Sequence, residues 1–370
     1  MQLHKLNILY VEPFYSGSHK RWIDAYKKYS KHNIDILSLP GRKWKWRMHG
    51  GAISLAEEFN LLNKKFDLII CSDMLNLPVF KSLCKNNLKN EKVVMYFHEN
   101  QLSYPWSPKD QDTKLNRDLS YYYINYTSSL LSDYNFFNSQ YHIDSYINGL
   151  KKYLKKMPDF QNYETIDVIH KKSEVLPIGC ELNQINNFKT RNKNSPIILW
   201  NHRWEYDKNP ESFFNTLFDL DKKGIEFSLV VLGESYEEYP EIFDIAKVKL
   251  KNKILYFGYC KSNDEYKKWL KKCDILPVTS IQDFFGISIV EAVAYGNYPI
   301  LPNRLSYPEI FNINKRPELF YNNLKELKEK LISVIKDNRC NKNLSNNIIK
   351  KYDWSNLCLE YDKKFESIIN

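Results

Sequence analysis

The chain has 370 residues, a length that exceeds one ordinary hydrophobic core and suits two α/β domains of about 100 to 200 residues each. With 43% hydrophobic and 26% charged residues, the composition is that of a globular protein and argues against a long disordered arm. The net charge of +10 favours anionic partners, such as nucleic acid, an anionic membrane surface or a phosphorylated small molecule, without choosing among them.

The sequence predicts neither a secretory signal nor a membrane span. The apolar run at residues 6–11 ends at Glu12 and Pro13, too early for a signal peptide, and no stretch reaches the roughly 18 apolar residues of a membrane span. We therefore expect a cytoplasmic protein without stable membrane insertion. The seven cysteines are widely scattered, which fits neither a zinc site nor a disulfide framework, so free thiols and no bound metal are expected.

Short β-branched or aromatic runs alternate with amphipathic stretches along the chain, the pattern of parallel sheets built from βαβ units. The predicted strands of the first half are residues 6–11, 34–39, 68–71, 93–98 and 134–138. Those of the second half are residues 197–201, 227–232, 254–257, 275–277 and 299–301, with helices at 210–223 and 264–273. Because the same rhythm occurs twice, we predict an α/β protein with two Rossmann-like domains that face each other across a cleft.

The boundary between these domains is predicted near LPIG, which ends at residue 179 and is followed by a polar, aperiodic stretch at 183–195. The N-terminal domain is then residues 1–178 and the C-terminal domain residues 179–353. Apolar side chains at helical spacing in residues 354–370 predict a terminal helix that packs against the N-terminal domain. Ligands of open α/β sheets bind beyond the carboxyl ends of the strands, so functional residues are expected just after strands.

The stretch DFFGISIVE places two carboxylates, Asp283 and Glu291, around a glycine turn and the start of a helix. Backbone N–H groups at such a helix start, near Gly286, Ile287 and Ser288, can face an anion. Carboxylates are also suitable acceptors for the hydroxyl groups of a sugar or ribose. Alternatively, this is a helix with an early acid that complements its dipole and with an ordinary buried face.

The stretch NHRWEYDKNP joins the predicted strand at 197–201 to the predicted helix at 210–223. Its two cations, Arg203 and Lys208, can neutralise a diphosphate, Arg through a planar fork and Lys as a mobile point charge. Fixed positive charge favours the departure of a nucleoside diphosphate, because that group gains negative charge as the bond to the sugar breaks. The alternative is a pair of solvated surface charges.

Two further loops follow strands in the first half. EPFYSGSHK places Gly17 in the turn before a helix, where it permits close approach of a ligand to the backbone; an ordinary strand-to-helix turn is the alternative. YFHENQ places His98 at the end of a buried strand. There it can hydrogen-bond a sugar or an acceptor, or be satisfied by the backbone.

These motifs resemble the retaining GT-B glycosyltransferases of family 4, through the carboxylate pair and the Arg203/Lys208 pair. More narrowly, the sequence resembles the glycosyltransferase-like domain-containing group known as tRNA-queuosine mannosyltransferases. The stretches that carry this narrower resemblance lie between residues 12 and 311 and are EPFYSGSHK, LPGRKWKWRMHGG, YFHENQLSYP, NHRWEYDKNPE and FFGISIVEAVAYGNYPILPNRLSYPEIF.

The resemblance implies a GT-B fold, an N-terminal acceptor domain and a C-terminal domain that binds a nucleotide sugar. It implies GDP-mannose as donor, the queuosine of tRNA as acceptor, retention of configuration, and no obligatory metal or other cofactor. In this scheme Arg203 and Lys208 hold the diphosphate, Glu291 the ribose and Asp283 a hydroxyl of the donor sugar. The remaining implied donor contacts are Gly17 at the phosphate, His98 at the sugar, Gly286, Ile287 and Ser288 around the sugar pocket, and Tyr259 at the base.

The family usually carries Glu where this chain has Asp283, whose carboxylate is set back by roughly 1.5 Å. The identity of the donor sugar therefore stays open. The expected mechanism is attack by the acceptor hydroxyl on the face from which the diphosphate leaves, with a phosphate oxygen taking the proton. No protein nucleophile is expected, because the two acids lie in a donor-binding context rather than as the opposed pair of a retaining glycosidase.

Cations alternate with tryptophans just beyond the second predicted strand, at Arg42, Lys43, Trp44, Lys45, Trp46 and Arg47. Cations suit phosphates and aromatic faces suit unpaired bases, as anticodon recognition requires. The alternative is a half-buried loop with packed tryptophans and solvated lysines. Two other functions stay open: a family 4 transferase with a lipid or polysaccharide acceptor, and a non-catalytic nucleic-acid-binding protein on a double-Rossmann scaffold.

Overall fold

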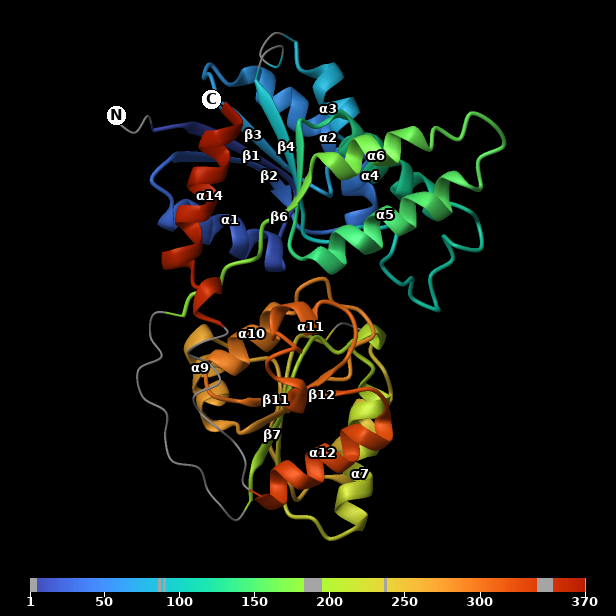
Figure 1. Cartoon of the computed structure of the whole chain (residues 1–370), viewed down its shortest axis with the longest axis vertical. Coiled ribbons are helices and arrows are strands. Elements are labelled where there is room, and N and C mark those ends of the chain that lie inside the picture. The colour runs from blue at the N-terminus through green and yellow to red at the C-terminus, as the bar shows by residue number, and fades with distance from the viewer. Residues whose placement is uncertain are drawn as a thin grey trace. The chain divides into compact units, whose positions relative to one another are not determined.

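The chain forms two units (Figure 1). This computed structural model describes residues 5–85, 88, 91–182, 195–235, 238–337 and 349–369. The N-terminal unit consists of Met1–Glu181 and Trp354–Asn370, and the C-terminal unit consists of Leu182–Asp353. The polar connector expected at 183–195, except for its last residue, and Cys340 lie outside the described residues.

The N-terminal unit is built on a parallel six-stranded sheet with the strand order β2-β1-β3-β4-β5-β6. Its strands are β1 (Asn7–Tyr15), β2 (Asn33–Pro40), β3 (Leu68–Ser72), β4 (Lys92–Phe97), β5 (Tyr134–Phe137) and β6 (Ser173–Val175). Successive side chains of a strand point to opposite faces. Leu9 and Val11 therefore join the main core on one face, while Tyr10 packs against Trp22 on the other.

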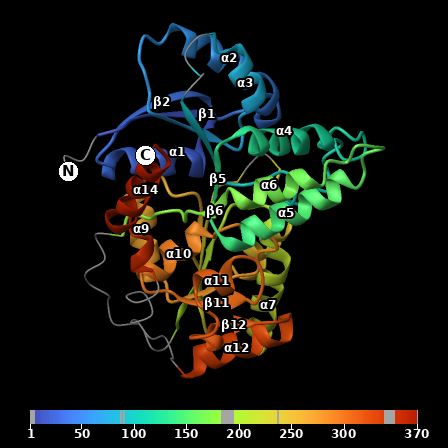
Figure 2. The same cartoon turned by 45° about the horizontal axis from the view of Figure 1, so that its top comes forward.

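Helices cover both faces of this sheet (Figure 2). They are α1 (Gly17–Tyr29), α2 (Trp44–Leu61), α3 (Leu77–Leu83), α4 (Asp118–Leu131), α5 (Gln140–Leu154), α6 (Glu164–Lys171) and α14 (Trp354–Ile369). The helices α2 to α6 contribute to the main hydrophobic core on one face. On the other face, Trp22 and Tyr26 of α1 pack against Tyr361 of α14.

The terminal helix α14 belongs to the N-terminal unit although it is distant from it in sequence. Tyr361 donates a hydrogen bond to the Pro177 carbonyl (2.7 Å). Gly179 lies against the ring of Trp354, where an added Cβ would come within 2.4 Å of Cδ2. The predicted return of the terminal helix to the N-terminal domain is confirmed. Residues 179–181, predicted in the C-terminal domain, lie in the N-terminal unit, because Gly179 and Cys180 contact Trp354 and Glu181 accepts from Lys28 of α1.

The C-terminal unit has a second parallel six-stranded sheet, with the order β12-β11-β10-β7-β8-β9. Its strands are β7 (Ile197–Asn201), β8 (Ser228–Leu232), β9 (Ile254–Gly258), β10 (Ile275–Pro277), β11 (Tyr298–Pro302) and β12 (Phe320–Tyr321). Its α-helices are α7 (Pro210–Lys222), α8 (Ile242–Lys249), α9 (Asn263–Lys272), α10 (Ile287–Ala294), α11 (Tyr307–Ile310) and α12 (Leu324–Asp337). Its short 3-10 turns are η1 (Tyr206–Lys208), η2 (Pro317–Leu319) and η3 (Lys350–Tyr352).

The observed elements confirm the predicted α/β class with two parallel sheets. Every predicted strand is present, although β1 continues through Glu12 to Tyr15. The strands β6 and β12 were not predicted, because stretches of three and two residues carry no readable periodicity. Six cysteines in the described part of the chain are free thiols. Among the described residues, no helix combines the length and the apolar character needed to cross a membrane.

Candidate active site

Lys208 and Asp283 form an ion pair at the carboxyl edge of the C-terminal sheet. Lys208 ends the turn η1 after β7, and Asp283 lies in the loop between β10 and α10. The Lys208 Nζ donates to Asp283 Oδ1 (3.0 Å) and to the Gln282 carbonyl (2.7 Å), and it lies 3.1 Å from Asp207 Oδ2. Two hydrogen bonds and one ion-pair contact thus surround the ammonium group. Because the Lys208 side chain is only 9% exposed, its charge is held in a fixed position.

Burial and pairing act in opposite directions on these groups. Burial alone would raise the pKa of Asp283, but the Lys208 ammonium holds it below its usual value. Burial alone would lower the pKa of Lys208, but the carboxylates of Asp283 and Asp207 hold it above its usual value. Both partners are therefore charged at neutral pH. Tyr307 donates a 2.5 Å hydrogen bond to Oδ2 of Asp283, which fixes the orientation of that carboxylate.

Glu291 lies on α10 and is oriented by a tyrosine of α9. The Tyr266 hydroxyl donates to Glu291 Oε2 (3.0 Å) and accepts from Asn201 Nδ2 (3.0 Å). Asn201 also donates to the Ser288 carbonyl (2.8 Å), which ties the end of β7 to the first turn of α10. The second predicted carboxylate is therefore placed by three different elements of the same unit.

Gly286 caps α10 in a conformation that requires glycine. Its φ is +81°, and an added Cβ would come within 2.9 Å of the Tyr307 ring. The first backbone donor that bonds back to Gly286 is the N–H of Ile289. The N–H groups of Ile287 and Ser288 therefore lie outside the intrahelical ladder, at the end of the helix where the dipole favours an anion.

Arg203 lies at the surface of the same unit, close to the buried cluster. Its side chain is 44% exposed and pairs with Glu205 (Nη2 to Oε2, 3.2 Å). Burial lowers the pKa of His202 to about 4, and the charges of Lys208 and Arg203 act in the same direction. The two predicted cations are thus near one neutral imidazole. Tyr259, the predicted base contact, is exposed directly after β9.

A buried network of hydrogen-bonded side chains lies at the carboxyl edge of the N-terminal sheet. Nδ1 of His19 is 2.9 Å from Glu12 Oε2, and Tyr10 donates to the same carboxylate oxygen (2.8 Å). The Tyr10 hydroxyl is in turn 3.3 Å from Nε2 of His98. All four side chains are buried. The charge of Glu12, in the middle of a sheet strand, is thus stabilised by pairing rather than by water.

The Tyr10 hydroxyl determines the tautomer of His98. Its single hydrogen is donated to Glu12, so in the contact with His98 the hydroxyl oxygen accepts and Nε2 donates. Nδ1 of His98 then carries the lone pair, and it has no hydrogen-bond partner among the described residues. Burial, reinforced by the charge of His19, holds the pKa of His98 well below its usual value. His98 therefore offers a neutral acceptor atom.

His19 supplies the positive charge of this hydrogen-bonded network. Burial alone would lower its pKa, but the Glu12 carboxylate raises the pKa of His19 to about 9. Ligand atoms of Glu12, His19 and His98 lie within 4.8 Å of one another, a spacing that a metal ion could bridge if His19 lost its proton. The Glu12 carboxylate already accepts four hydrogen bonds within the protein, which competes with such a use.

Gly17 is the first residue of α1, directly after β1. Its φ is +53°, in the left-handed region that favours glycine. Nothing lies within 4 Å of the position that a Cβ would occupy. The space beside this backbone therefore admits a ligand, as the predicted approach of a phosphate requires.

Two of the six predicted acceptor-binding residues are engaged inside the N-terminal unit. The Lys45 Nζ pairs with Asp110 (2.8 Å) and Asp112 (2.5 Å). The ring of Trp44 packs against Trp106, with centroids 6.0 Å apart. These contacts attach the long loop before α4 to the start of α2. For these two residues the structure corresponds to the alternative of a packed segment, except that Lys45 is ion-paired rather than solvated.

The other four residues lie at the surface to different degrees. Trp46 is 65% exposed, and Arg42 and Lys43 are exposed. Arg47 is partly buried and donates from Nε to a backbone carbonyl (3.1 Å). The expected loop is in fact helical from Trp44 onward, because Lys43 reverses the chain with a left-handed φ of +57° and α2 begins immediately after it.

Two known protein families match the chain, and their matches divide close to the boundary between the two units. Residues 7–180 match the family described as tRNA-queuosine alpha-mannosyltransferase N-terminal, and residues 183–351 match Glycosyl transferases group 1. A Drosophila melanogaster protein named tRNA-queuosine alpha-mannosyltransferase is 35% identical over 341 residues, which cover 90% of this chain and 87% of that protein. The chain belongs to the tRNA-queuosine alpha-mannosyltransferase family. It is a glycosyltransferase, as the sequence motifs predicted.

Solved structures place this family member in the GT-B fold. Sucrose-phosphate synthase from Thermosynechococcus elongatus superimposes with a TM-score of 0.71 at 12% identity, covering 98% of this chain and 99% of that one. HepE of Anabaena, in complex with UDP, superimposes with a TM-score of 0.63 at 14% identity, covering 98% of this chain and 100% of that one. At these identities the likeness concerns the fold alone, and it confirms the predicted GT-B architecture.

Several residues of this family member's candidate site were not singled out from its sequence. Glu12 carried a readable signal, because a carboxylate that continues an apolar strand must find a partner when buried. Tyr266 and Tyr307 carried none, since each meets its carboxylate only after distant segments fold together. Asp73, which accepts from the backbone N–H of His98 (2.8 Å), follows β3 and was open to the same reasoning as Glu12.

Proposed function

We propose that this enzyme transfers mannose from GDP-mannose to queuosine in tRNA, with retention of the anomeric configuration. The observation that carries the proposal is the 35% identity, along nearly the whole chain, to the Drosophila protein. The name of that protein specifies an alpha linkage. Because GDP-mannose is itself an α-glycoside, formation of an alpha linkage retains the configuration.

The diphosphate of the donor binds at the carboxyl edge of the C-terminal sheet. The partly exposed guanidinium of Arg203 provides planar donors for phosphate oxygens. Lys208 contributes its charge and exchanges one of its three contacts for a phosphate oxygen, the longest being that with Asp207 (3.1 Å). The N–H groups of Ile287 and Ser288 add two neutral donors at the start of α10.

The donor sugar and ribose are held by the two carboxylates. Asp283, fixed by Lys208 and Tyr307, accepts from a hydroxyl of the sugar. Glu291, oriented by Tyr266, accepts from the ribose hydroxyls. Both groups act here as hydrogen-bond acceptors rather than as nucleophiles, in keeping with their engagement by neighbouring donors.

In the reaction, the bond between the anomeric carbon and the diphosphate oxygen breaks while the acceptor hydroxyl forms a new bond on the same face. The acceptor proton passes to a phosphate oxygen, and GDP leaves. Positive charge from Arg203 and Lys208 stabilises the departing diphosphate, so the scheme requires no metal. The lone pair on Nδ1 of His98 accepts a hydrogen bond from a sugar hydroxyl.

The test is to incubate the protein with a panel of nucleotide sugars and queuosine-containing tRNA, then to digest the tRNA and weigh its nucleosides. We expect queuosine to gain the mass of one hexose with GDP-mannose and not with UDP-sugars. Arg203→Ala should lower turnover more than tenfold, since a lost transition-state charge contact is worth a few kcal/mol. Transfer from another donor alone, or no change of any nucleoside, would contradict the proposal.

A further inference from the structure

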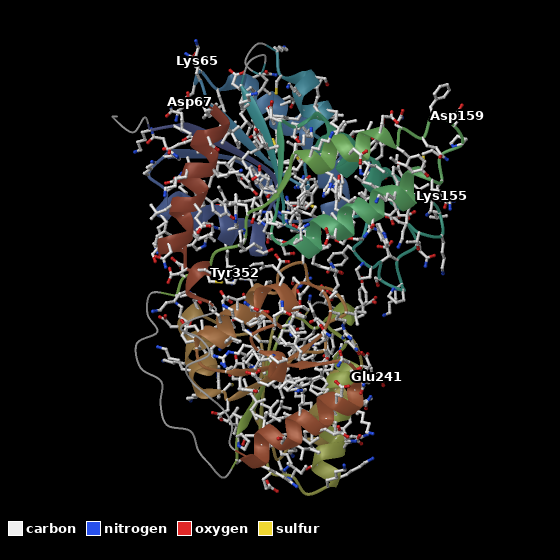
Figure 3. All side chains as sticks on the ribbon, viewed as in Figure 1. Lys65, Asp67, Lys155, Asp159, Glu241 and Tyr352 are labelled. Carbon is white, nitrogen blue, oxygen red and sulfur yellow. The ribbon has the colours of Figure 1, made fainter. Side chains whose placement is uncertain are left out.

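The helices α5 and α6 form a hairpin that extends outward from the N-terminal sheet (Figure 1). We call residues 151–163, at its outer end, the hairpin tip; Figure 3 places Lys155 and Asp159 there. The other end of α5 is close to the candidate site, because Asn138, just before the helix, donates to the His98 carbonyl (2.9 Å). A helix of 15 residues spans about 22 Å, so the tip is about 20 Å from His98.

Four lysines of the hairpin tip concentrate positive charge. Lys151, Lys152, Lys155 and Lys156 are all exposed, and none of their amines has an ion pair or a side-chain hydrogen bond within the part of the chain that the structure describes. Residues four apart on a helix are neighbours, so these lysines repel one another in two pairs. This repulsion opposes the favourable interaction of Lys151 and Lys152 with the helix dipole, and no acidic side chain of the described residues pairs with the four lysines.

Hydrogen bonding to the end of the helix does not account for this cluster, and the helix dipole accounts only for the two lysines of its last turn, Lys151 and Lys152. Such lysines often hydrogen-bond the last carbonyl groups of the helix. Here the backbone itself satisfies these carbonyls, because the N–H groups of Lys155, Lys156 and Met157 bond to the carbonyls of Lys151, Tyr153 and Leu154. Gln161 donates from Nε2 to the carbonyls of Met157 (2.8 Å) and Lys155 (3.3 Å), just beyond the helix. The nearby acids, Asp159 and Glu164, are exposed and form no ion pair with the tip lysines in the described structure.

The hairpin tip also presents an aromatic ring on a fixed loop. Phe160 is 88% exposed and has a left-handed φ of +41°, an unfavourable conformation for a bulky residue. The loop is anchored by Gln161, which bonds back to the Met157 carbonyl ahead of Phe160, and by Thr165, which donates to the Asn162 carbonyl (2.6 Å) and contacts Tyr126 (2.8 Å). Strained backbone held by surrounding bonds is a mark of function.

We propose that the hairpin tip is a docking surface for RNA, in which the four lysines contact phosphates and Phe160 stacks on an unpaired base. Lysine amines and an aromatic face are the two elements with which proteins hold RNA without reading its sequence. This inference rests on the proposed function, since it makes tRNA the partner. At about 20 Å from His98, the tip contacts nucleotides other than the one that is modified.

The experiment compares two variants with equal loss of charge. The first replaces Lys151, Lys152, Lys155 and Lys156 by Gln; the control replaces four exposed lysines of the C-terminal unit by Gln. The control lysines are Lys222, Lys223, Lys251 and Lys315. Binding of tRNA is measured by fluorescence anisotropy over a range of salt, independently of turnover, and KM and kcat are measured with queuosine-containing tRNA.

For the tip variant we expect the Kd and the KM for tRNA to rise at least about tenfold, with kcat unchanged. The slope of log Kd against log salt should fall by about 2 to 4, because each phosphate contact contributes about 0.7 to 0.9. The control variant should keep the wild-type slope. Phe160→Ser alone should weaken binding at least about fivefold, with little dependence on salt.

Each possible outcome decides the inference. Equal Kd values and slopes in the tip and control variants would overturn it, whether or not the enzyme modifies tRNA. If the wild type binds tRNA tightly and the tip variant does not, but no sugar is transferred, the proposed donor or acceptor is wrong and the docking surface stands. If the tip variant lost binding to vesicles containing phosphatidylserine but bound tRNA as the wild type does, the tip would be a membrane-binding surface instead.

Discussion

The two units stabilise a buried carboxylate with different cations. Each places a buried cation against a buried carboxylate at the carboxyl edge of a six-stranded parallel sheet. In the C-terminal unit the cation is Lys208, which is charged throughout the physiological range. In the N-terminal unit it is His19, whose pKa of about 9 depends on its partner Glu12. The comparison teaches that the Lys208–Asp283 pair should be insensitive to pH, while the His19–Glu12 pair beside His98 should respond to it.

The largest effect is expected from breaking the C-terminal pair. Lys208→Met leaves the buried carboxylates of Asp207 and Asp283 without their counter-charge, so we expect a loss of about 3 to 5 kcal/mol in the free energy of unfolding. Turnover should fall at least about a hundredfold, because a fixed charge is lost at the departing diphosphate. Urea unfolding and single-turnover kinetics measure the two effects.

Arg203→Gln is the control that separates charge from stability in this unit. Since Arg203 is 44% exposed, its replacement should leave the unfolding midpoint nearly unchanged while turnover still falls. If neither variant alters turnover by more than about twofold, the C-terminal cations do not act on the diphosphate.

The next largest effect is expected from a change in the tautomer of His98, in the N-terminal unit. Tyr10→Phe removes the oxygen that accepts from Nε2 of His98, so the ring becomes free to place its proton on Nδ1. We expect kcat to fall about tenfold with little change in the KM for the donor. Nitrogen-15 NMR of the His98 ring should show mainly the Nε2–H form in the wild type and a mixture in the variant. A wild-type ring protonated at Nδ1 would contradict the assignment.

The pH dependence of stability should also distinguish the two units. The folded-state pKa of His19 is raised from 6.5 to about 9, so its contribution to stability is complete below about pH 6.5 and is lost as the pH rises through 9. In urea titrations between pH 6 and 10, the wild type should lose stability faster than His19→Gln. Burial also raises the pKa of Asp73, with an effect of the same sign, and the charge of His19 opposes that shift, so both proteins are compared in an Asp73→Asn background.

The smallest effect is expected at Glu291. Tyr266→Phe deletes the hydroxyl that orients this carboxylate, and a single hydrogen bond of this kind is worth about 0.5 to 1.5 kcal/mol. We expect the KM for the donor to rise about threefold to tenfold with kcat nearly unchanged. An equal loss in kcat would indicate instead that Glu291 acts in the transition state.

The strands of both sheets could be predicted from the sequence, because they are short apolar runs whose pattern differs clearly from that of the helices, as at β3 and β8. The sequence was sufficient to propose Asp283 and Lys208 because each follows a strand, where ligands of such sheets bind. It did not predict that these two side chains pair with each other, since they are 75 positions apart and only folding brings them together.

At residues 42–47, where cations alternate with tryptophans, the sequence was not sufficient to predict the structure. The alternation of cations and tryptophans favoured a surface that contacts RNA, with a half-buried loop as the alternative, but Lys45 has acidic partners in the loop before α4. Composition reports which charges are present and not which of them are already neutralised. The hairpin tip was overlooked for a related reason: lysines near a helix end are common, and only the structure shows that backbone N–H groups, not these lysines, bond the last carbonyls of the helix.

The position of α14 has a consequence for how the protein is made. Tyr361 and Trp354 belong to the packing of the N-terminal unit, yet they are translated after the whole C-terminal unit. The half of the protein that leaves the ribosome first thus waits for residues 354–369 before the outer side of α1 is covered. Until then the ring of Tyr26 lacks its contacts with Trp354, Tyr361 and Phe365 on the nascent chain, where chaperones that bind aromatic surface would find it.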